Sequence, residues 1–118
     1  MGFFDPPQLI QAEVFASVPA RLRKKGHPST WIDANHPGSG LDCFLEGPAF
    51  DRDGNLYMVD IPYGRVLRMS PKGEFEVAAQ YEGWPNGLAI HKDGRVFIAD
   101  YRLGIMVLDP ASAVSSLF

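Results

Sequence analysis

The stretch that decides the fold is Glu46-Gly-Pro-Ala-Phe-Asp-Arg-Asp-Gly-Asn-Leu-Tyr-Met-Val-Asp60, because it returns 40 positions later as Asn86-Gly-Leu-Ala-Ile-His-Lys-Asp-Gly-Arg-Val-Phe-Ile-Ala-Asp100. The two copies align without a gap as far as residue 110. Their identical positions are Gly47/Gly87, Ala49/Ala89, Asp53/Asp93, Gly54/Gly94, Asp60/Asp100 and Gly64/Gly104. A repeat of this length, built from short strands, is typical of a propeller blade.

Turn residues divide each copy into four β-rich runs. In the first copy the turns are Asp53-Gly54, Pro62-Tyr63-Gly64 and Pro71-Lys72-Gly73, and glycine suits such turns because it accepts a positive φ. The predicted strands are therefore residues 47–51, 56–61, 65–70 and 75–80 in the first copy and 87–91, 96–101, 105–109 and 114–118 in the second.

The second strand of each copy is almost continuously apolar: Leu56-Tyr57-Met58-Val59 and Val96-Phe97-Ile98-Ala99. Continuous apolarity indicates a strand covered on both faces, as it is in a propeller, where every blade lies between two neighbours. The sequence thus predicts an all-β protein with two four-stranded antiparallel β-propeller blades, residues 44–82 and 83–118.

Two blades share only one interface, so both outer faces would expose a large apolar patch. Repeat proteins usually need three or more units to bury their faces. We therefore expect the chain to be a truncated part of a longer propeller. Self-association of several copies through the exposed blade faces is the alternative.

Residues 1–43 precede the repeat and form a leader. The segment 12–18, Ala-Glu-Val-Phe-Ala-Ser-Val, partly alternates and predicts a strand, with a short helix as the alternative. In a complete propeller such a strand could close the ring by joining the last blade. Residues 26–40 are rich in Gly, Pro and Ser and predict a long loop held by Trp31.

Composition narrows the classes of partner. The formal net charge of -3 gives no reason to expect nucleic-acid binding, and no apolar run is long enough to span a membrane. Cys43 is the single cysteine, which excludes an internal disulfide, and the first residues lack a signal-peptide pattern. A cytoplasmic protein is the expectation. The basic run from Arg21 to Lys25 is either a solvated segment or a contact to an acidic group or a phosphate.

Glu46 and Asn86 are the candidate site residues, because each directly precedes the predicted innermost strand of its blade. Residues at that position converge on the central axis of a propeller. Carboxylate and amide oxygens suit a hard cation such as Ca²⁺. Both residues could instead cap turns. The recurrence of Asp60 and Asp100 indicates a structural role at turns, and Cys43 is predicted to be an inert thiol.

The repeats resemble the SMP-30/gluconolactonase family over residues 44–110, and Glu46-Gly-Pro48 is the most specific element. The resemblance implies a six-bladed propeller with a divalent metal, commonly Ca²⁺, in its central channel. It also implies that Glu46 is the first metal ligand and that Asn86 lies near the metal or the substrate.

The activity implied by the resemblance is metal-dependent hydrolysis of a lactone or related sugar-acid ester. The remaining ligands and the general-base Asp would lie beyond Phe118, so this chain alone is expected to be inactive. The alternative is a non-catalytic propeller module for protein or ligand binding, because Asp53-Gly-Asn-Leu-Tyr-Met-Val-Asp60 also resembles the NHL-type repeat.

Overall fold

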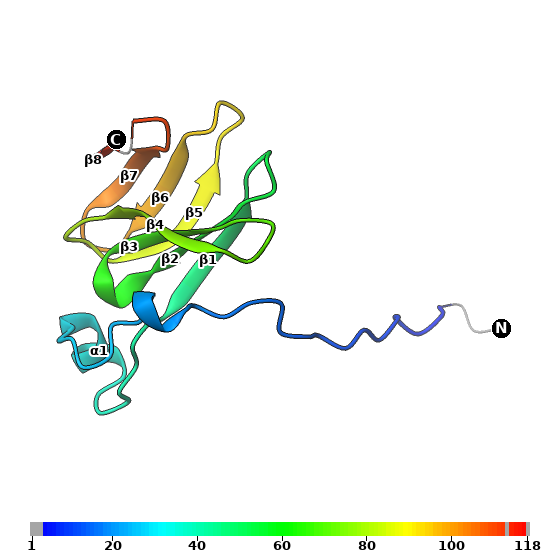
Figure 1. Cartoon of the computed structure of the whole chain (residues 1–118), viewed down its shortest axis with the longest axis horizontal. Coiled ribbons are helices and arrows are strands. Elements are labelled where there is room, and N and C mark those ends of the chain that lie inside the picture. The colour runs from blue at the N-terminus through cyan, green and yellow to red at the C-terminus, as the bar shows by residue number, and fades with distance from the viewer. Residues whose placement is uncertain (1–3, 113, 118) are drawn as a thin grey trace.

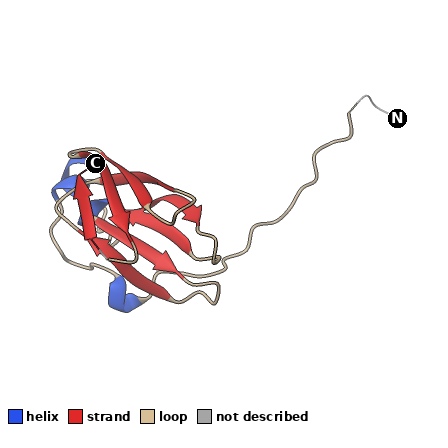
Figure 2. Cartoon of the chain, turned by 90° about the horizontal axis from the view of Figure 1, so that it is seen from above, coloured by secondary structure: helices blue, strands red, loops and turns tan. Residues whose placement is uncertain are grey.

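The computed structural model describes residues 4–112 and 114–117 and is mostly β, with two antiparallel sheets packed face to face (Figures 1 and 2). Sheet A has the strand order β1-β2-β3-β4 and sheet B the order β5-β6-β7-β8. The strands are β1 (Leu45–Phe50), β2 (Leu56–Asp60), β3 (Arg65–Met69), β4 (Phe75–Gln80), β5 (Pro85–Ile90), β6 (Val96–Asp100), β7 (Gly104–Asp109) and β8 (Val114–Leu117). Every strand that the sequence predicts within the two repeats is present, although residue 118 lies outside the described residues.

The β1–β2 turn shows how local sequence sets these strands. The Asp51 carboxylate accepts hydrogen bonds from the backbone N–H of Asp53 at 2.9 Å and of Asn55 at 2.8 Å. Gly54 follows with φ +82°, a conformation that glycine adopts without strain. The chain therefore reverses within a few residues, and Leu56 begins β2 opposite Phe50.

The main core lies between the two sheets. Alternate residues of β2, Tyr57 and Val59, pack there against β6 and β7, together with Ile61, Val66, Val96, Ile98, Met106 and Leu108. Met58 points to the other face of sheet A, where a second core forms with Leu67, Met69, Phe75 and Val18 of the leader. Both faces of β2 are thus covered, as predicted.

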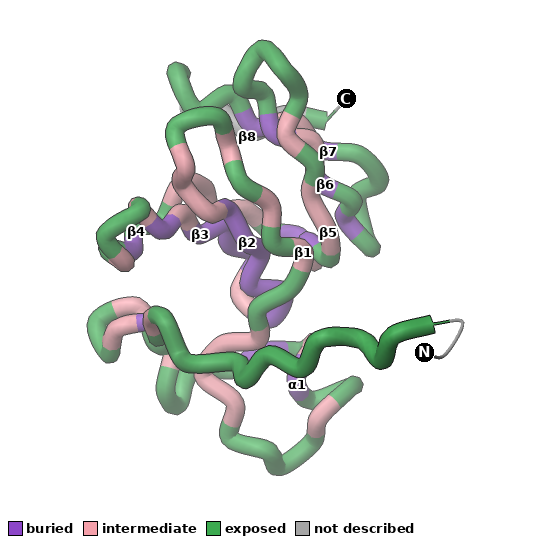
Figure 3. The backbone as a smooth tube through the Cα atoms, turned by 90° about the vertical axis from the view of Figure 1, so that its right-hand side faces the viewer, coloured by how far each residue is buried: buried purple, intermediate pink, exposed green. Residues whose placement is uncertain are grey.

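For β6 only one face is covered within the described residues, as expected for an outer face of two blades that share a single interface. Val96 and Ile98 are fully buried against sheet A, but Phe97 is only half-buried and Ala99 is exposed. The continuous apolar run therefore has one covered face and one open face. Figure 3 shows the buried residues concentrated in the interior strands of the sheets.

A buried ion pair fixes the β2–β3 turn. Arg65 Nε and Nη2 both donate to Asp60 Oδ2, at 2.9 and 2.5 Å, and both side chains are almost completely buried. Asp60 Oδ1 accepts from the Phe44 N–H at 2.7 Å, and Arg65 Nη1 donates to the Leu22 carbonyl at 2.8 Å. The pair therefore ties the leader to sheet A.

The pairing register corrects the ungapped repeat. Asp60 of β2 pairs with Arg65, whereas the equivalent Asp100 of β6 pairs with Gly104. The turn in sheet B is one residue shorter, so Gly64 and Gly104 are not structural equivalents. Beyond this turn the two sheets correspond at an offset of 39 residues.

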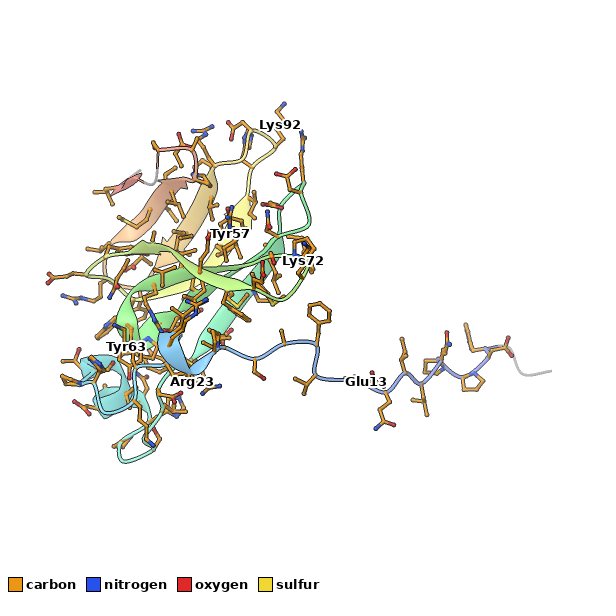
Figure 4. The ribbon with its side chains drawn as sticks, in the orientation of Figure 1. Glu13, Arg23, Tyr57, Tyr63, Lys72 and Lys92 are labelled. Atoms are coloured by element: carbon orange, nitrogen blue, oxygen red, sulfur yellow. The ribbon has the colours of Figure 1, made fainter. Side chains whose placement is uncertain are left out.

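The leader differs from both of its predicted elements. Residues 26–40 do not form a continuous loop, because α1 (Thr30–Asn35) forms within them, and the Ser29 hydroxyl caps it by accepting from the Ile32 N–H at 3.3 Å. No strand forms at 12–18. That segment is part of an extended arm that leads away from the sheets, with Glu13 far from the body (Figures 1 and 4).

Beyond the arm, short contacts fasten the leader to sheet A. Val18 is buried in the second core, and η1 (Ala20–Leu22) follows it. Arg21 donates to the Phe75 carbonyl at 2.5 Å, and Arg23 pairs with Asp42 at 2.7 Å. Of these two members of the basic run, Arg23 contacts an acidic group, as the second interpretation requires, whereas Arg21 contacts a backbone carbonyl. The hydroxyl of Tyr63, in η2 (Ile61–Tyr63), donates to the Lys24 carbonyl at 3.4 Å (Tyr63 is labelled in Figure 4).

No helix in the described part of the chain is long and apolar enough to cross a membrane.

We expect Arg65→Ala to lower the free energy of unfolding by about 3–5 kcal/mol, because it leaves the Asp60 carboxylate buried without its charged partner. Arg95→Ala is the matched control: it breaks the exposed pair with Asp93 and should change stability little. Urea unfolding followed by tryptophan fluorescence measures both. Equal destabilisation by the two substitutions would contradict the role of the buried pair.

Candidate functional site

The site begins where the first strands of the two sheets meet. β1 and β5 lie side by side, and they approach most closely at Gly47 and Gly87. A Cβ on Gly47 would lie 2.7 Å from the Cα of Gly87 and 3.0 Å from the backbone nitrogen of Leu88. Gly47 also has φ +56°. Only glycine therefore allows this approach without a shift of the backbone.

Glu46 and Asn86 immediately precede these two glycines. Both lie inside their strands, rather than just before them as the sequence predicts, because β1 begins at Leu45 and β5 at Pro85. Both side chains are exposed. The structure thus brings the segments that carry the two candidate ligands onto adjacent strands of neighbouring sheets.

Neither side chain has a partner within residues 4–112 and 114–117: no hydrogen bond or ion pair forms to the Glu46 carboxylate or the Asn86 amide. The turn-capping role considered from the sequence requires a hydrogen bond to a turn amide. In the described chain, the oxygens of both residues are free to bind a ligand.

Glu46 and Asn86 offer the type of oxygen ligand that a hard cation binds, but too few of them to complete a site. Ca²⁺ takes about six to eight oxygen ligands from carboxylates, amides, carbonyls and water. Glu46 and Asn86 supply side-chain oxygens of the right type. Among the described residues, however, no three His, Cys, Asp or Glu side chains gather in a group that could hold a metal ion. The two residues can therefore form only part of such a site.

The structure also contains a hollow that no sequence motif indicated. It is formed by the β2–β3, β4–β5 and β6–β7 turns together with the start of α1. It has a volume of about 670 Å³, and its lining includes Trp84, Arg102, Glu82 and Asp33. The Arg102 guanidinium lies 5.3 Å from the centre of the Trp84 ring. Trp84 also packs against the main core. Glu46 and Asn86 do not line this hollow.

The remaining candidates have structural roles. Asp100 Oδ1 accepts from the N–H groups of Arg102 and Leu103 at 2.8 and 2.9 Å, which confirms its predicted place in a turn. Burial and the neighbouring Asp100 carboxylate raise the pKa of Tyr81. Burial likewise raises the pKa of the Cys43 thiol, which keeps it protonated and agrees with an inert cysteine.

The chain has distant, partial similarity to curated lactonases. It is 30% identical over 70 residues to Lactonase drp35 of Staphylococcus aureus (strain bovine RF122 / ET3-1) and 32% identical over 71 residues to that of strain MRSA252; each match covers 58% of this chain and 20% of the relative. Lactonase drp35 of Staphylococcus epidermidis is 35% identical over 57 residues, which is 46% of this chain and 17% of the relative.

The matched part of the chain thus spans about a fifth of the length of these relatives. No family model matches the chain. The similarity to lactonases agrees with the resemblance to the SMP-30/gluconolactonase family that the sequence motifs indicate.

We expect Gly47→Ala to destabilise the protein by about 1–3 kcal/mol more than Gly40→Ala, because only the first forces a methyl group into the backbone of β5. Gly40 is the matched control: its φ of +67° carries similar backbone strain, but a Cβ there meets no atom within 4 Å. Thermal or urea unfolding compares the two variants. An equal loss would mean that β1 and β5 are not in close contact.

Proposed function

We propose that the chain is part of a metal-dependent, lactonase-like hydrolase in which sheets A and B are neighbouring blades of a propeller. In this proposal Glu46 is a ligand of a divalent cation, Ca²⁺, and Asn86 binds the same ion or the substrate beside it. The substrate class is a small lactone of the sugar-acid type. A cytoplasmic location stays a prediction from the sequence.

The observation that carries the proposal is the contact of β1 with β5 at Gly47 and Gly87. It puts two exposed oxygen-bearing side chains, without partners in the described chain, on adjacent strands at the start of each repeat. The similarity to the drp35 lactonases supports the reaction class. Because that similarity covers about a fifth of those proteins, the activity is proposed for a whole enzyme rather than for this chain alone.

The chemistry assigned to each residue follows from its functional group. The Glu46 carboxylate contributes negative charge and one or two oxygens to a cation, and the Asn86 amide offers either a carbonyl oxygen to the cation or an N–H donor to a substrate oxygen. A divalent cation, when bound, polarises an ester carbonyl and lowers the pKa of bound water. The general base and the other ligands belong to segments outside this chain.

We expect Ca²⁺ to bind to residues 1–118 weakly, with a dissociation constant of about 10⁻³ M or higher, because two side chains supply few of the oxygens the ion needs. An NMR titration of ¹⁵N-labelled protein should move the amide signals of Glu46, Gly47 and Gly87. Glu46→Gln should abolish these shifts. Glu74→Gln, which removes an exposed carboxylate next to β4, should leave them unchanged.

Two results would count against this proposal. If saturating Ca²⁺ moves none of the three signals, or moves them equally in the Glu46→Gln variant, Glu46 is not a ligand and the non-catalytic propeller module becomes the better interpretation. Submicromolar binding together with lactone hydrolysis by the chain alone would contradict the proposed incompleteness of the site.

A further inference from the structure

The hollow between the β2–β3, β4–β5 and β6–β7 turns holds an arginine side chain whose charge has no partner. The Arg102 guanidinium lies 5.3 Å from the centre of the Trp84 ring, and it forms no hydrogen bond or ion pair within residues 4–112 and 114–117. Trp84 packs against the main core, and the Arg102 backbone N–H donates to Asp100 Oδ1 at 2.8 Å, so both supports of the side chain are fixed. An arginine held on an aromatic ring can still bind a carboxylate through two parallel hydrogen bonds.

Two carboxylates line the same hollow without reaching this arginine. Asp33 lies on α1 and Glu82 lies in the β4–β5 connection; both residues are exposed, and neither side chain forms an ion pair or a hydrogen bond in the described chain. The wall that carries Asp33 is fixed, because the hydroxyl of Ser29, which caps α1, donates to the Pro62 carbonyl of η2 at 2.9 Å. Groups of opposite charge thus line one hollow of about 670 Å³ and do not pair across it.

These charges decide which kind of small molecule fits the hollow. A simple anion would be attracted by Arg102 but repelled by Asp33 and Glu82, and a simple cation would be repelled by Arg102. A neutral polyol would leave the guanidinium without an anionic partner. A molecule with one carboxylate and several hydroxyl groups complements both signs, because its carboxylate accepts from Arg102 and its hydroxyls donate to the two carboxylates. Small-molecule sites of about 300–1,000 Å³ are common, and the hollow lies in that range.

We propose that this hollow binds a polyhydroxy carboxylate, the class of compound that forms when water opens a sugar lactone. Water adds to the lactone carbonyl and the ring C–O bond breaks, which leaves one new carboxylate and one new hydroxyl on the same molecule. The closed lactone has no free carboxylate for Arg102, so the hollow selects the product of that reaction over its substrate. The choice of a hydroxy acid over an amino acid rests on the proposed function; the recognition itself uses three charged side chains and needs no metal ion.

An NMR titration of ¹⁵N-labelled residues 1–118 with sodium D-gluconate, in the absence of Ca²⁺, tests the proposal. The amide signals of Asp33, Glu82 and Arg102 and the indole signal of Trp84 should move, with a dissociation constant of about 10⁻³ M, as for a small ligand held by few contacts. Three compounds with six carbons are the comparison: D-glucitol lacks the carboxylate, hexanoate lacks the hydroxyls, and 6-aminohexanoate carries an ammonium in their place. At equal ionic strength each should bind about tenfold more weakly or worse.

Two substitutions assign the halves of the ligand. Arg102→Gln should weaken gluconate binding by about tenfold or more, because it removes the charged donor of two hydrogen bonds. Arg95→Gln is the matched control: it removes an exposed arginine that pairs with Asp93 and does not line the hollow, so binding should be unchanged. Glu82→Gln should reduce the preference for gluconate over hexanoate severalfold, because a neutral amide accepts a hydroxyl hydrogen bond more weakly than a carboxylate does.

Four results would each overturn the proposal: gluconate moves none of the signals around the hollow, one of the three comparison compounds binds as tightly as gluconate, Arg102→Gln binds gluconate as well as the unchanged chain, or Glu82→Gln keeps the full preference. Both substituted positions are exposed, and the same spectra check that each variant is folded. Failure of the proposed function has a different signature. Ca²⁺ would then leave the signals of Glu46, Gly47 and Gly87 in place, while gluconate would still move that of Arg102.

Discussion

The close approach of β1 and β5 at Gly47 and Gly87 is the constraint from which the rest of the arrangement follows. With no side chain at Gly47, the two backbones come within contact distance. This sets the separation of the sheets, and the core side chains of β2, β6 and β7 fill the space that it leaves. Because the glycines lie inside β1 and β5 and directly follow Glu46 and Asn86, the same contact places the strands that carry the candidate ligands side by side. Packing and site therefore depend on one backbone contact.

The two sheets have diverged where the leader joins them. In sheet A the buried pair of Asp60 and Arg65 holds the Leu22 carbonyl and the Phe44 N–H. Sheet B has Gly104 at the position of Arg65, and its Asp100 instead accepts hydrogen bonds from two turn amides. An arginine there would have no leader segment to bind. The one-residue difference between the β2–β3 and β6–β7 turns thus reflects the different segments that the two sheets contact.

The strands could be predicted from the sequence because Asp-Gly and Pro-x-Gly turns are local signals, as the hydrogen bonds of Asp51 show. The strand register beyond Asp60 could not be predicted, since Gly64 and Gly104 match in sequence although the strand pairing shows that they are not equivalent.

The sequence analysis also did not predict the helix α1 in the leader. Its capping residue, Ser29, was a usable signal, but the Gly and Pro residues around it favoured a loop. The equivalence of Glu46 and Asn86 could be predicted from the repeat offset. Their place inside β1 and β5 and their lack of partners in the described chain could not, since these depend on strand pairing and tertiary packing.

The continuous apolar run of β6 gives sheet B an apolar face on the side that is turned away from sheet A. Phe97 and Ala99 lie on the face of sheet B that is turned away from sheet A, and they have the apolar character that their equivalents Tyr57 and Val59 need for packing. A neighbouring unit on that face would extend the arrangement of β1 and β5 by one more inner strand.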